Sequence, residues 1–340
     1  MTSLHRDVTS LTIAIPTFQR NELLRTNLAH LLRQAGHFGE SGHLRVMIID
    51  NASSEPVAES LGQLPPWVEV HRNPHNIGGN ANIVRCFELC STAWLWIMGD
   101  DDQPDENAVA NALQHITTHS TATAIVYAVR NQVTRPRPFT TAGADGLLRQ
   151  LDSFANLLFV PSTLYHVATL RPCFDLSYHY AYSCAPHLVL LLTSLAKHGG
   201  ETIFVTESNI AFERPEIENR GSIIPIAHGL PILLELPDLT TSARRQLARH
   251  LGRFPSLGSL VHQTLLRQCF GPVGTWGGMR DYLSAVNRLP ISVTPLRRLA
   301  ALLALPALLV PRISYPIVAW TYRLLTGQTS GRHKLPLERL

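Results

Sequence analysis

Short apolar runs alternate with segments of helical periodicity over the first 130 residues of the chain. Apolar runs of strand length lie at residues 11–15, 44–49, 67–71, 94–98 and 122–129. Strands that alternate with helices indicate a mostly parallel sheet with helices on both faces. The first third of the chain therefore predicts an α/β fold.

The intervening segments predict helices. Leucines recur on one face of residues 21–32, and Gly36 is expected to end this helix. A second helix is expected over residues 80–90. Asp105 is expected to cap a third, which would carry an apolar stripe.

Polar residues follow four of the predicted strands directly. In a parallel sheet, ligands bind beyond the carboxyl ends of the strands, so these residues are expected to meet at one edge. They are Thr17 and Arg20 after the first strand, Asp50 after the second, the segment 76–82 after the third, and Asp100, Asp101 and Asp102 after the fourth.

Three consecutive aspartates, Asp100 to Asp102, follow the apolar run 94–98. Like charges this close repel, so a fold keeps them only beside a cation or in water. Hard oxygen ligands on a loop suit Mg²⁺ or Mn²⁺, which often share their coordination with substrate phosphates. A solvated acidic turn, helped by Pro104, is the alternative.

Composition limits the class of protein. The chain has 340 residues, of which 16% are charged, and a formal net charge of +4, which does not favour a nucleic-acid partner. Its five cysteines lack zinc spacing and are odd in number, which is typical of reduced thiols in a cytosolic protein. The N-terminal apolar run is too short for a signal peptide.

The second half of the chain is less regular. Residues 131–146 are expected to form a connection, residues 154–167 to be strand-like, and residues 186–198 to form an apolar helix. Beyond residue 228 the pattern turns helical and basic. The apolar run 299–310, flanked by arginines, is shorter than the roughly 20 residues of a spanning helix. Burial in a hairpin and an interfacial helix both stay open.

Four segments, 12–20, 46–53, 73–80 and 100–102, together resemble the inverting GT-A fold glycosyltransferases of family 2. The last segment lies where that family has its metal-binding DxD motif. The form of residues 94–102 is most similar to the bacterial O-antigen branch, which includes abequosyltransferases. The resemblance is strong over residues 10–130 and weaker to about residue 225.

The resemblance implies a fold and a division of the chain. The fold is the GT-A nucleotide-diphospho-sugar transferase fold, an α/β fold with a mostly parallel central sheet flanked by helices and a C-terminal helical extension. The catalytic domain would span residues 8–225, with a nucleotide-binding half at 8–130 and an acceptor half at 131–225. Residues 226–340 would form a helical, basic and apolar region.

The resemblance also implies a donor site and a metal site. Asp100, Asp101 and Asp102 would hold Mg²⁺ or Mn²⁺, which neutralises the leaving diphosphate. In an extended segment Asp100 and Asp102 share one side, although Asp101 is an alternative ligand. Asp50 could also cap a turn through Ser53 and Ser54, and Arg20 and Arg85 could instead be solvated. The residues expected to bind the donor are Pro16, Thr17, Arg20, Asp50, Asn76, Gly79, Arg85 and Asp100.

An inverting transferase needs a base that deprotonates the acceptor hydroxyl. The family usually supplies an Asp from a Glu-Asp pair at a helix start, and the corresponding helix here lacks that pair. His187 stands at this helix start, where a helix N-terminus favours its neutral form. Asp175 is the rival candidate.

The implied function is a hexosyltransferase-type glycosyltransferase of class EC 2.4. It would move a hexose or deoxyhexose, with inversion, from a nucleotide diphosphate to a hydroxyl of a lipid-linked glycan or polysaccharide. The protein would be cytoplasmic, with peripheral contact with the inner membrane as an open alternative. A nucleotidyltransferase and a sugar-nucleotide-binding protein without turnover are the rival functions. The absence of Gly-x-Gly-x-x-Gly after the first strand argues against a dehydrogenase.

Overall fold

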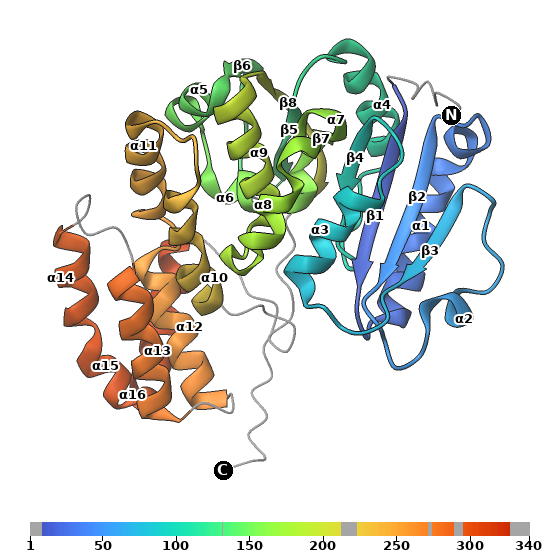
Figure 1. Ribbon diagram of the computed structural model, residues 1–340. Helices are drawn as coiled ribbons and strands as arrows, with labels where there is room; N and C mark the ends of the chain where they lie inside the picture. The colour runs from blue at the N-terminus through green and yellow to red at the C-terminus, as the bar shows by residue number, and fades with distance from the viewer. Residues whose placement is uncertain (1–8, 131, 212–222, 271–273, 289–294, 327–340) are drawn as a thin grey trace. The chain divides into compact units, whose positions relative to one another are not determined.

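The computed structural model describes residues 9–130, 132–211, 223–270, 274–288 and 295–326. Residues 11–211 contain an eight-stranded sheet with the order β3-β2-β1-β4-β7-β5-β8-β6 (Figure 1). The strands are β1 (Leu11–Thr17), β2 (Leu44–Asp50), β3 (Val68–Arg72), β4 (Trp94–Ile97), β5 (Ala124–Arg130), β6 (Phe139–Ala142), β7 (Thr163–His166) and β8 (Glu201–Ala211).

Most of the sheet is parallel. Strands β3, β2, β1 and β4 pair in parallel, and so do β5 and β8. Strand β7 runs antiparallel between β4 and β5, and β6 is antiparallel to β8. Within the parallel part, Thr17 pairs with Asp50, and Asp50 pairs with Arg72. The last residues of three strands therefore lie side by side at the carboxyl edge of the sheet.

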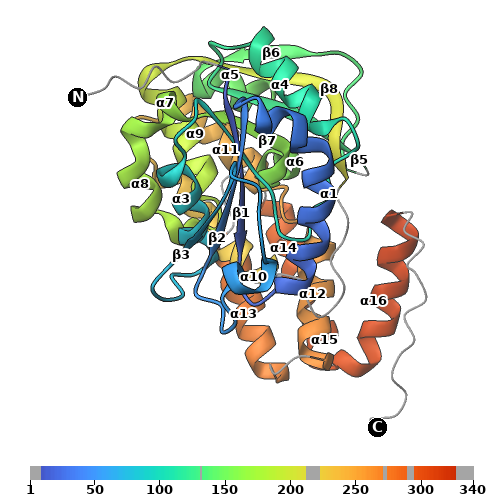
Figure 2. The same ribbon diagram turned by 90° about the vertical axis from the view of Figure 1, so that its right-hand side faces the viewer.

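Helices cover both faces of the sheet (Figure 2). On one face, α1 (Asn21–Glu40) and α4 (Ala108–Thr118) pack on side chains such as Ile13, Val46 and Trp96. On the other face, α3 (Gly79–Leu89) and α9 (Pro186–His198) pack on residues such as Met47 and Leu95. Neighbouring residues of one strand point to opposite faces, so both faces of these strands are apolar. The predicted α/β layers and mostly parallel sheet are confirmed.

Shorter helices connect these elements. They are α2 (Val57–Leu61), α5 (Gly143–Gln150), α6 (Phe154–Leu158), α7 (Val167–Leu170), α8 (Phe174–His179) and the 3₁₀ turn η3 (Ala181–Ser183). The predicted strand-like segment at 154–167 is thus partly wrong, because its first part is the helix α6 and only its end forms β7.

Two predicted helix boundaries are also wrong. Gly36 does not end α1, which continues to Glu40, and the glycine with a positive φ beyond the helix is Gly42, at 81°. Asp105 does not cap α4, whose N-cap residue is Asn107. The Asp105 carboxylate instead pairs with Arg130, at the end of β5.

The chain forms two compact units. The first comprises residues 1–220 and 232–247, and so includes most of α11 (Thr241–Leu251). The second comprises residues 221–231 and 248–340. The predicted domain boundary at residue 225 stays a prediction, since compactness does not test whether either part folds independently.

The second unit is helical. Its core contains Leu260, Leu265, Ala285 and Leu308, and the Tyr282 hydroxyl donates to the carbonyl of Ala301 at 3.0 Å. None of the described helices is both long enough and apolar enough to cross a membrane. The helices of this unit are α10 (Ile223–Gly229), α12 (Leu257–Phe270), α13 (Thr275–Arg288), α14 (Pro295–Leu303), α15 (Leu305–Leu309) and α16 (Pro311–Thr326).

Candidate active site at the carboxyl edge of the sheet

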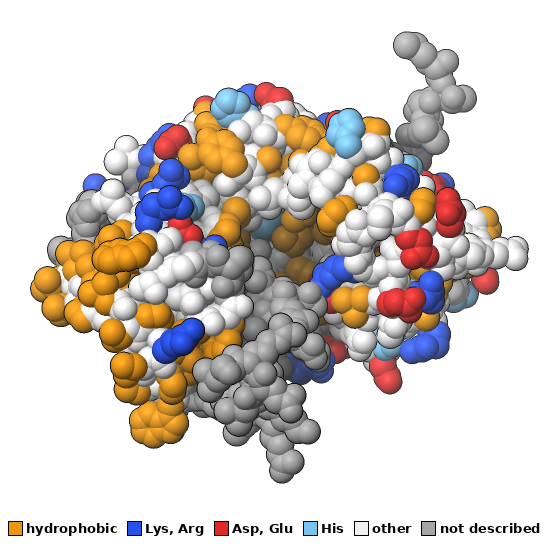
Figure 3. All heavy atoms as spheres, turned by 90° about the horizontal axis from the view of Figure 1, so that it is seen from below, with side chains coloured by type: hydrophobic (Ala, Val, Ile, Leu, Met, Phe, Trp, Pro, Cys, Tyr) orange, Lys and Arg blue, Asp and Glu red, His pale blue; other side chains and the backbone are white. Residues whose placement is uncertain are grey.

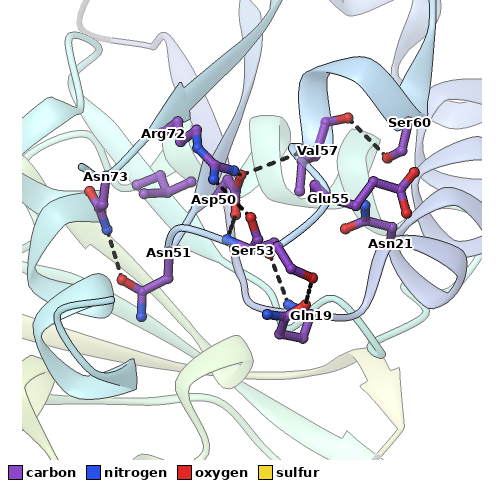
Figure 4. A network of polar contacts seen from close by, with 12 residues as sticks. Gln19, Asn21, Asp50, Asn51, Ser53, Glu55, Val57, Ser60, Arg72 and Asn73 are labelled. Carbon is purple, nitrogen blue, oxygen red and sulfur yellow. Dashed lines mark hydrogen bonds and ion pairs between the residues drawn. The ribbon is translucent and has the colours of Figure 1, made fainter. Parts of the chain in front are cut away.

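Asp50 ends β2 and is fully buried (Figure 4). Its carboxylate accepts hydrogen bonds from the backbone N–H of Ser53 at 2.8 Å and of Val57 at 3.4 Å, and it pairs with Arg72. Burial acts to raise the pKa of Asp50, but the hydrogen bonds from Ser53, Val57 and Arg72 outweigh it and lower that pKa. Asp50 is therefore a buried anion that orders the loop after β2, as one of the two sequence interpretations proposed.

The loops after β1 and β2 hold each other in place. Gln19 takes a positive φ of 59°, and its backbone N–H donates to Ser53 Oγ at 2.9 Å. The Ser54 hydroxyl donates to Gln19 Oε1 at 2.8 Å. A non-glycine residue at positive φ is uncommon and is kept where its surroundings fix it. The segment from Thr17 to Arg20 is thus anchored to the loop after β2.

Four asparagines stabilise the loop after β3 through side-chain hydrogen bonds. Asn51 Nδ2 donates to Asn76 Oδ1 at 2.8 Å, and Asn51 Oδ1 accepts from Asn73 Nδ2 at 3.0 Å. Asn73 Nδ2 also donates to Asn82 Oδ1 at 2.8 Å. Asn76 Oδ1 accepts from the N–H of Gly78, whose φ is 84°. The loop that leads into α3 is therefore fixed by side-chain amides, and it leaves open space around Gly79.

The acidic triplet forms a turn just beyond β4. Asp100 is 3% exposed, and its Oδ2 accepts from Thr17 Oγ1 at 2.6 Å. Arg20 donates from Nη1 to Asp100, and from Nη2 to Asp101 Oδ2 at 2.8 Å. Burial and the charge of Asp101 raise the pKa of Asp100 against the hydrogen bond from Thr17 and the charge of Arg20. The ends of β1 and β4 are thus joined by charge-assisted hydrogen bonds.

Asp102 points back along the turn. Its Oδ2 accepts from the backbone N–H of Gly99 at 2.6 Å, and its own N–H donates to the carbonyl of Gly99 at 3.2 Å. Burial, with the charges of Asp101 and Asp100, raises the pKa of Asp102 to about 7. The expected alternation of an extended segment does not apply, because the chain turns here. Asp100 and Asp101 are the pair of carboxylates that binds a single cation, the guanidinium of Arg20.

The carboxylate oxygens of Asp100, Asp101 and Asp102 are ligands of the kind that a hard divalent ion prefers. Two observations fit such an ion: Asp100 and Asp101 converge on a single guanidinium, and a Cβ atom at Gly99 would lie 2.8 Å from oxygens of both Asp101 and Asp102. In the described part of the chain, however, no group of three or more Asp, Glu, His or Cys side chains forms a preformed metal site.

Three other predicted donor residues take different positions. Pro16 lies within β1, in register with Ile49. Gly79 begins α3, after the loop that Asn76 fixes. Arg85, on the same helix, pairs with Glu88, which also accepts from the Tyr178 hydroxyl at 2.9 Å. Arg85 is therefore engaged with Glu88 rather than with the aspartates.

The two candidate bases differ in exposure and in place. His187, the second residue of α9, is 1% exposed and packs near Tyr165, and neither ring nitrogen has a hydrogen bond among the described atoms. Burial lowers the pKa of His187 to about 4, opposed in part by the backbone of Leu157 and Leu158. Asp175 is exposed on α8.

The turn that leads into α9 lies beside the start of α3. Cys184, at a φ of 62°, interacts with the Asn80 side chain, and burial raises the pKa of its thiol although Asn80 opposes this. Asp175 lies toward the other end of α3, because its neighbour Phe174 packs edge-on against Phe87. His187 follows the turn that contacts Asn80, and its ring lies 6.5 Å from the ring of Tyr165.

Several residues of the site were not singled out from the sequence. Asn27 of α1 donates to the carbonyl of Asp100 at 2.7 Å, and Arg72 pairs with Asp50. A buried polar residue on the apolar face of α1 was the available signal for Asn27, which is 5% exposed. Arg72 gave no signal, since its partner is 22 residues away in sequence.

Solved structures share this architecture. TarS residues 1–349 of S. aureus, in complex with UDP-GlcNAc, matches with a TM-score of 0.53 and 13% identity over 94% of this chain and 92% of that one. The mannosyltransferase PcManGT from Pyrobaculum calidifontis, in complex with GDP-Man and Mn²⁺, matches with a TM-score of 0.50 and 14% identity over 96% of this chain and 91% of that one. No curated protein sequence matches the chain.

These likenesses define the class: the fold is the GT-A fold, with the polar edge of its sheet built from the ends of β1 to β4. The family model described as Glycosyl transferase family 2 matches residues 12–171, which include all four of those strand ends. Residues 12–171 therefore match glycosyltransferase family 2, and the resemblance seen in the sequence is confirmed over this segment.

Proposed function

We propose that this protein transfers a sugar from a nucleotide diphosphate to an acceptor hydroxyl, with inversion and with the help of Mg²⁺ or Mn²⁺. The observation that carries the proposal is the meeting of Thr17, Arg20, Asp100 and Asp101 at the carboxyl edge of the sheet. The complexes of TarS with UDP-GlcNAc and of PcManGT with GDP-Man and Mn²⁺ support a sugar nucleotide as the donor.

The chain's own residues would divide the work. Asp100 and Asp101 would hold the divalent ion, with Asp102 beside them. When bound, such an ion neutralises negative charge on a leaving diphosphate. Asp50 and the asparagine network would keep the loops after β2 and β3 in position for the base and ribose. Gly79 would let the donor approach the start of α3 closely.

We propose His187 as the base that accepts the proton of the acceptor hydroxyl. Its place after the turn that contacts Asn80 favours it, and burial keeps its ring neutral, which is the form that accepts a proton. Because His187 is 1% exposed, acceptor binding must uncover it. Asp175 is exposed, but it lies toward the far end of α3.

The acceptor is proposed to be a lipid-linked glycan or a polysaccharide, reached at the cytoplasmic face of the inner membrane. Support comes from the second unit, whose helices expose large apolar side chains (Figure 3). The sequence from residue 282 to residue 326 contains arginines but no aspartate or glutamate. Basic, apolar helices of this kind bind anionic lipid surfaces peripherally.

Turnover of sugar nucleotides tests the proposal. Wild-type protein with Mn²⁺ and a lipid-linked oligosaccharide extract should release nucleoside diphosphate from one class among the UDP-, GDP-, CDP- and dTDP-sugars. His187→Asn should lower kcat by about 10²- to 10⁴-fold at unchanged donor affinity, the usual contribution of a general base. Asp175→Asn, the matched control, should keep the wild-type rate.

Two outcomes would favour the rival functions. Nucleotide binding without turnover in wild-type protein would support a sugar-nucleotide-binding protein. Release of inorganic diphosphate from a nucleoside triphosphate and a sugar phosphate would support a nucleotidyltransferase.

A further inference from the structure

Arg20 is bound to the two aspartates that are proposed to hold the metal ion. The residue precedes α1 directly, and its guanidinium reaches across to the turn after β4, some 80 residues on. One nitrogen donates to Asp100 and the other to Asp101 Oδ2, at 2.8 Å. Among the side chains that the structure describes, Arg20 is the cation that neutralises this turn.

Asp100 has little freedom to accept a further ligand. Thr17 occupies its Oδ2, Arg20 occupies its Oδ1, and its side chain is 3% exposed. A divalent ion that binds Asp100 and Asp101 together must take the place of the guanidinium. Two cations on the same pair of carboxylates would repel each other strongly in this partly buried setting. The ion and the present position of Arg20 therefore exclude one another.

The Arg20 side chain is freer to move out of this ion pair than the side chain of Asp100 is. Its side chain is 31% exposed, whereas Asp100 is held by Thr17 through its side chain and by Asn27 through its carbonyl. The planar fork of a guanidinium suits the oxygens of a phosphate as well as those of a carboxylate. A donor diphosphate at this edge would be the anion within reach of a displaced Arg20.

We propose that Arg20 competes with the divalent ion for Asp100 and Asp101, and that it moves onto the diphosphate of the donor when the ion binds. The second step rests on the proposed function, whereas the competition on the aspartates does not. Arg20 then keeps the acidic turn neutral without a donor, and the ion and the nucleotide diphosphate bind cooperatively. Each is expected to bind weakly without the other, because only together do they supply ligands for Asp100, Asp101 and Arg20.

Titration of Mn²⁺ without nucleotide, followed by electron paramagnetic resonance, tests the competition. Arg20→Gln, which keeps polarity but not charge, should bind Mn²⁺ at least 10-fold more tightly than wild type. Arg20→Lys offers a single point charge that cannot bridge both carboxylates. Its Mn²⁺ affinity should therefore lie between those of wild type and Arg20→Gln. Arg25→Gln is the matched control, because Arg25 lies on α1 but pairs with Glu22, and its Mn²⁺ affinity should equal that of wild type.

A second titration, with nucleoside diphosphate in saturating Mn²⁺, tests the movement. Arg20→Gln should lose at least 10-fold in affinity for the diphosphate, and it should bind the corresponding nucleoside as wild type does. Equal diphosphate affinity in Arg20→Gln and wild type would overturn the movement.

Unchanged or weaker Mn²⁺ binding by Arg20→Gln would overturn the competition. If the glutamine variant does not fold, unchanged or weaker binding by Arg20→Lys would overturn it in the same way. If no nucleoside diphosphate binds wild-type protein, the proposed function and the movement both fail, while the Mn²⁺ titration still decides the competition.

Discussion

Gly99 is the residue on which the shape of the acidic turn depends most directly. A Cβ atom there would lie 2.8 Å from Asp101 Oδ1 and 2.8 Å from Asp102 Oδ2, closer than such atoms normally approach. The backbone N–H of Gly99 also donates to Asp102. Both carboxylates can fold back over the turn only because position 99 has no side chain.

Gly99→Ala is therefore expected to displace Asp101 and Asp102 while it leaves the fold intact. The free energy of unfolding should fall by about 1 kcal/mol, the usual net value of one hydrogen bond. The affinity for nucleoside diphosphate in the presence of Mn²⁺ should fall at least 10-fold. Calorimetric titration and urea denaturation measure the two effects.

Gly36→Ala is the control for this substitution. Gly36 lies inside α1, and a Cβ atom added there would have no neighbouring atom within 4 Å. Alanine should therefore stabilise the protein by about 1 kcal/mol without affecting binding. If Gly99→Ala binds nucleoside diphosphate in the presence of Mn²⁺ as tightly as wild type does, the turn does not depend on glycine.

At the scale of secondary-structure elements, α9 carries a buried histidine with a measurable consequence. Burial lowers the pKa of His187 to about 4, whereas an unfolded histidine titrates near 6.5. Between these values the unfolded chain binds more protons than the folded one, so stability falls as the pH falls from about 6.5 toward 4.

His187→Gln removes this dependence on pH. Between pH 7 and pH 5, the wild type should lose about 2 kcal/mol more stability than the variant, as obtained from those two pKa values. Urea denaturation at the two pH values measures the difference. His198→Gln, at the other end of α9, should keep the wild-type loss. An equal loss in His187→Gln would mean that the ring is not held neutral.

The elements that the sequence predicted well share one property: each is a strand or helix whose apolar pattern is complete within the element. Strands β1, β2 and β4 and helix α9 are of this kind, because they are buried on more than one face. Strand β7, by contrast, is four residues long and lies between β4 and β5 by antiparallel pairing. No local pattern encodes that partner choice.

The candidate site shows the same division. The positions of Thr17, Asp50 and the acidic triplet at strand ends followed from the sequence, because parallel strands bring their carboxyl ends to one edge. The pairing of Arg20 with Asp100 and of Arg72 with Asp50 did not follow, since each joins segments that only the folded sheet brings together. The end of α1 and the start of α4, predicted at Gly36 and Asp105 but found at Glu40 and Asn107, also depend on tertiary neighbours, which a single residue type does not encode.

At the scale of the whole molecule, the second unit presents an apolar surface to solvent. Trp276 is 75% exposed, Leu303 73%, Ile313 69%, Trp320 63% and Ile317 62%. Exposed apolar side chains in such number mark an interaction surface, and tryptophans favour the boundary between lipid and water. Self-association through this surface would bring arginines together, whereas an anionic lipid surface would attract them.

Vesicle sedimentation tests the proposed membrane contact. The full chain should bind vesicles that contain anionic phospholipid, bind neutral vesicles more weakly, and dissociate as salt is raised. Trp320→Ser combined with Ile317→Ser should lower the partition coefficient at least 10-fold, because burial of both side chains is lost. Thr321→Ser, an exposed polar change on the same helix, is the control. Equal binding of the double variant and wild type would contradict this role for α16.

The carboxyl edge of the sheet is proposed to bind a nucleoside diphosphate through a metal ion held by the acidic turn. The most direct measurement is calorimetric titration of the protein with UDP, GDP, CDP and dTDP, with and without Mn²⁺, repeated on Asp100→Ala combined with Asp101→Ala. We expect Mn²⁺-dependent binding of one nucleotide, which the double variant loses. Failure of all four to bind wild-type protein, with or without Mn²⁺, would contradict this function and leave the aspartates as an acidic turn neutralised by Arg20.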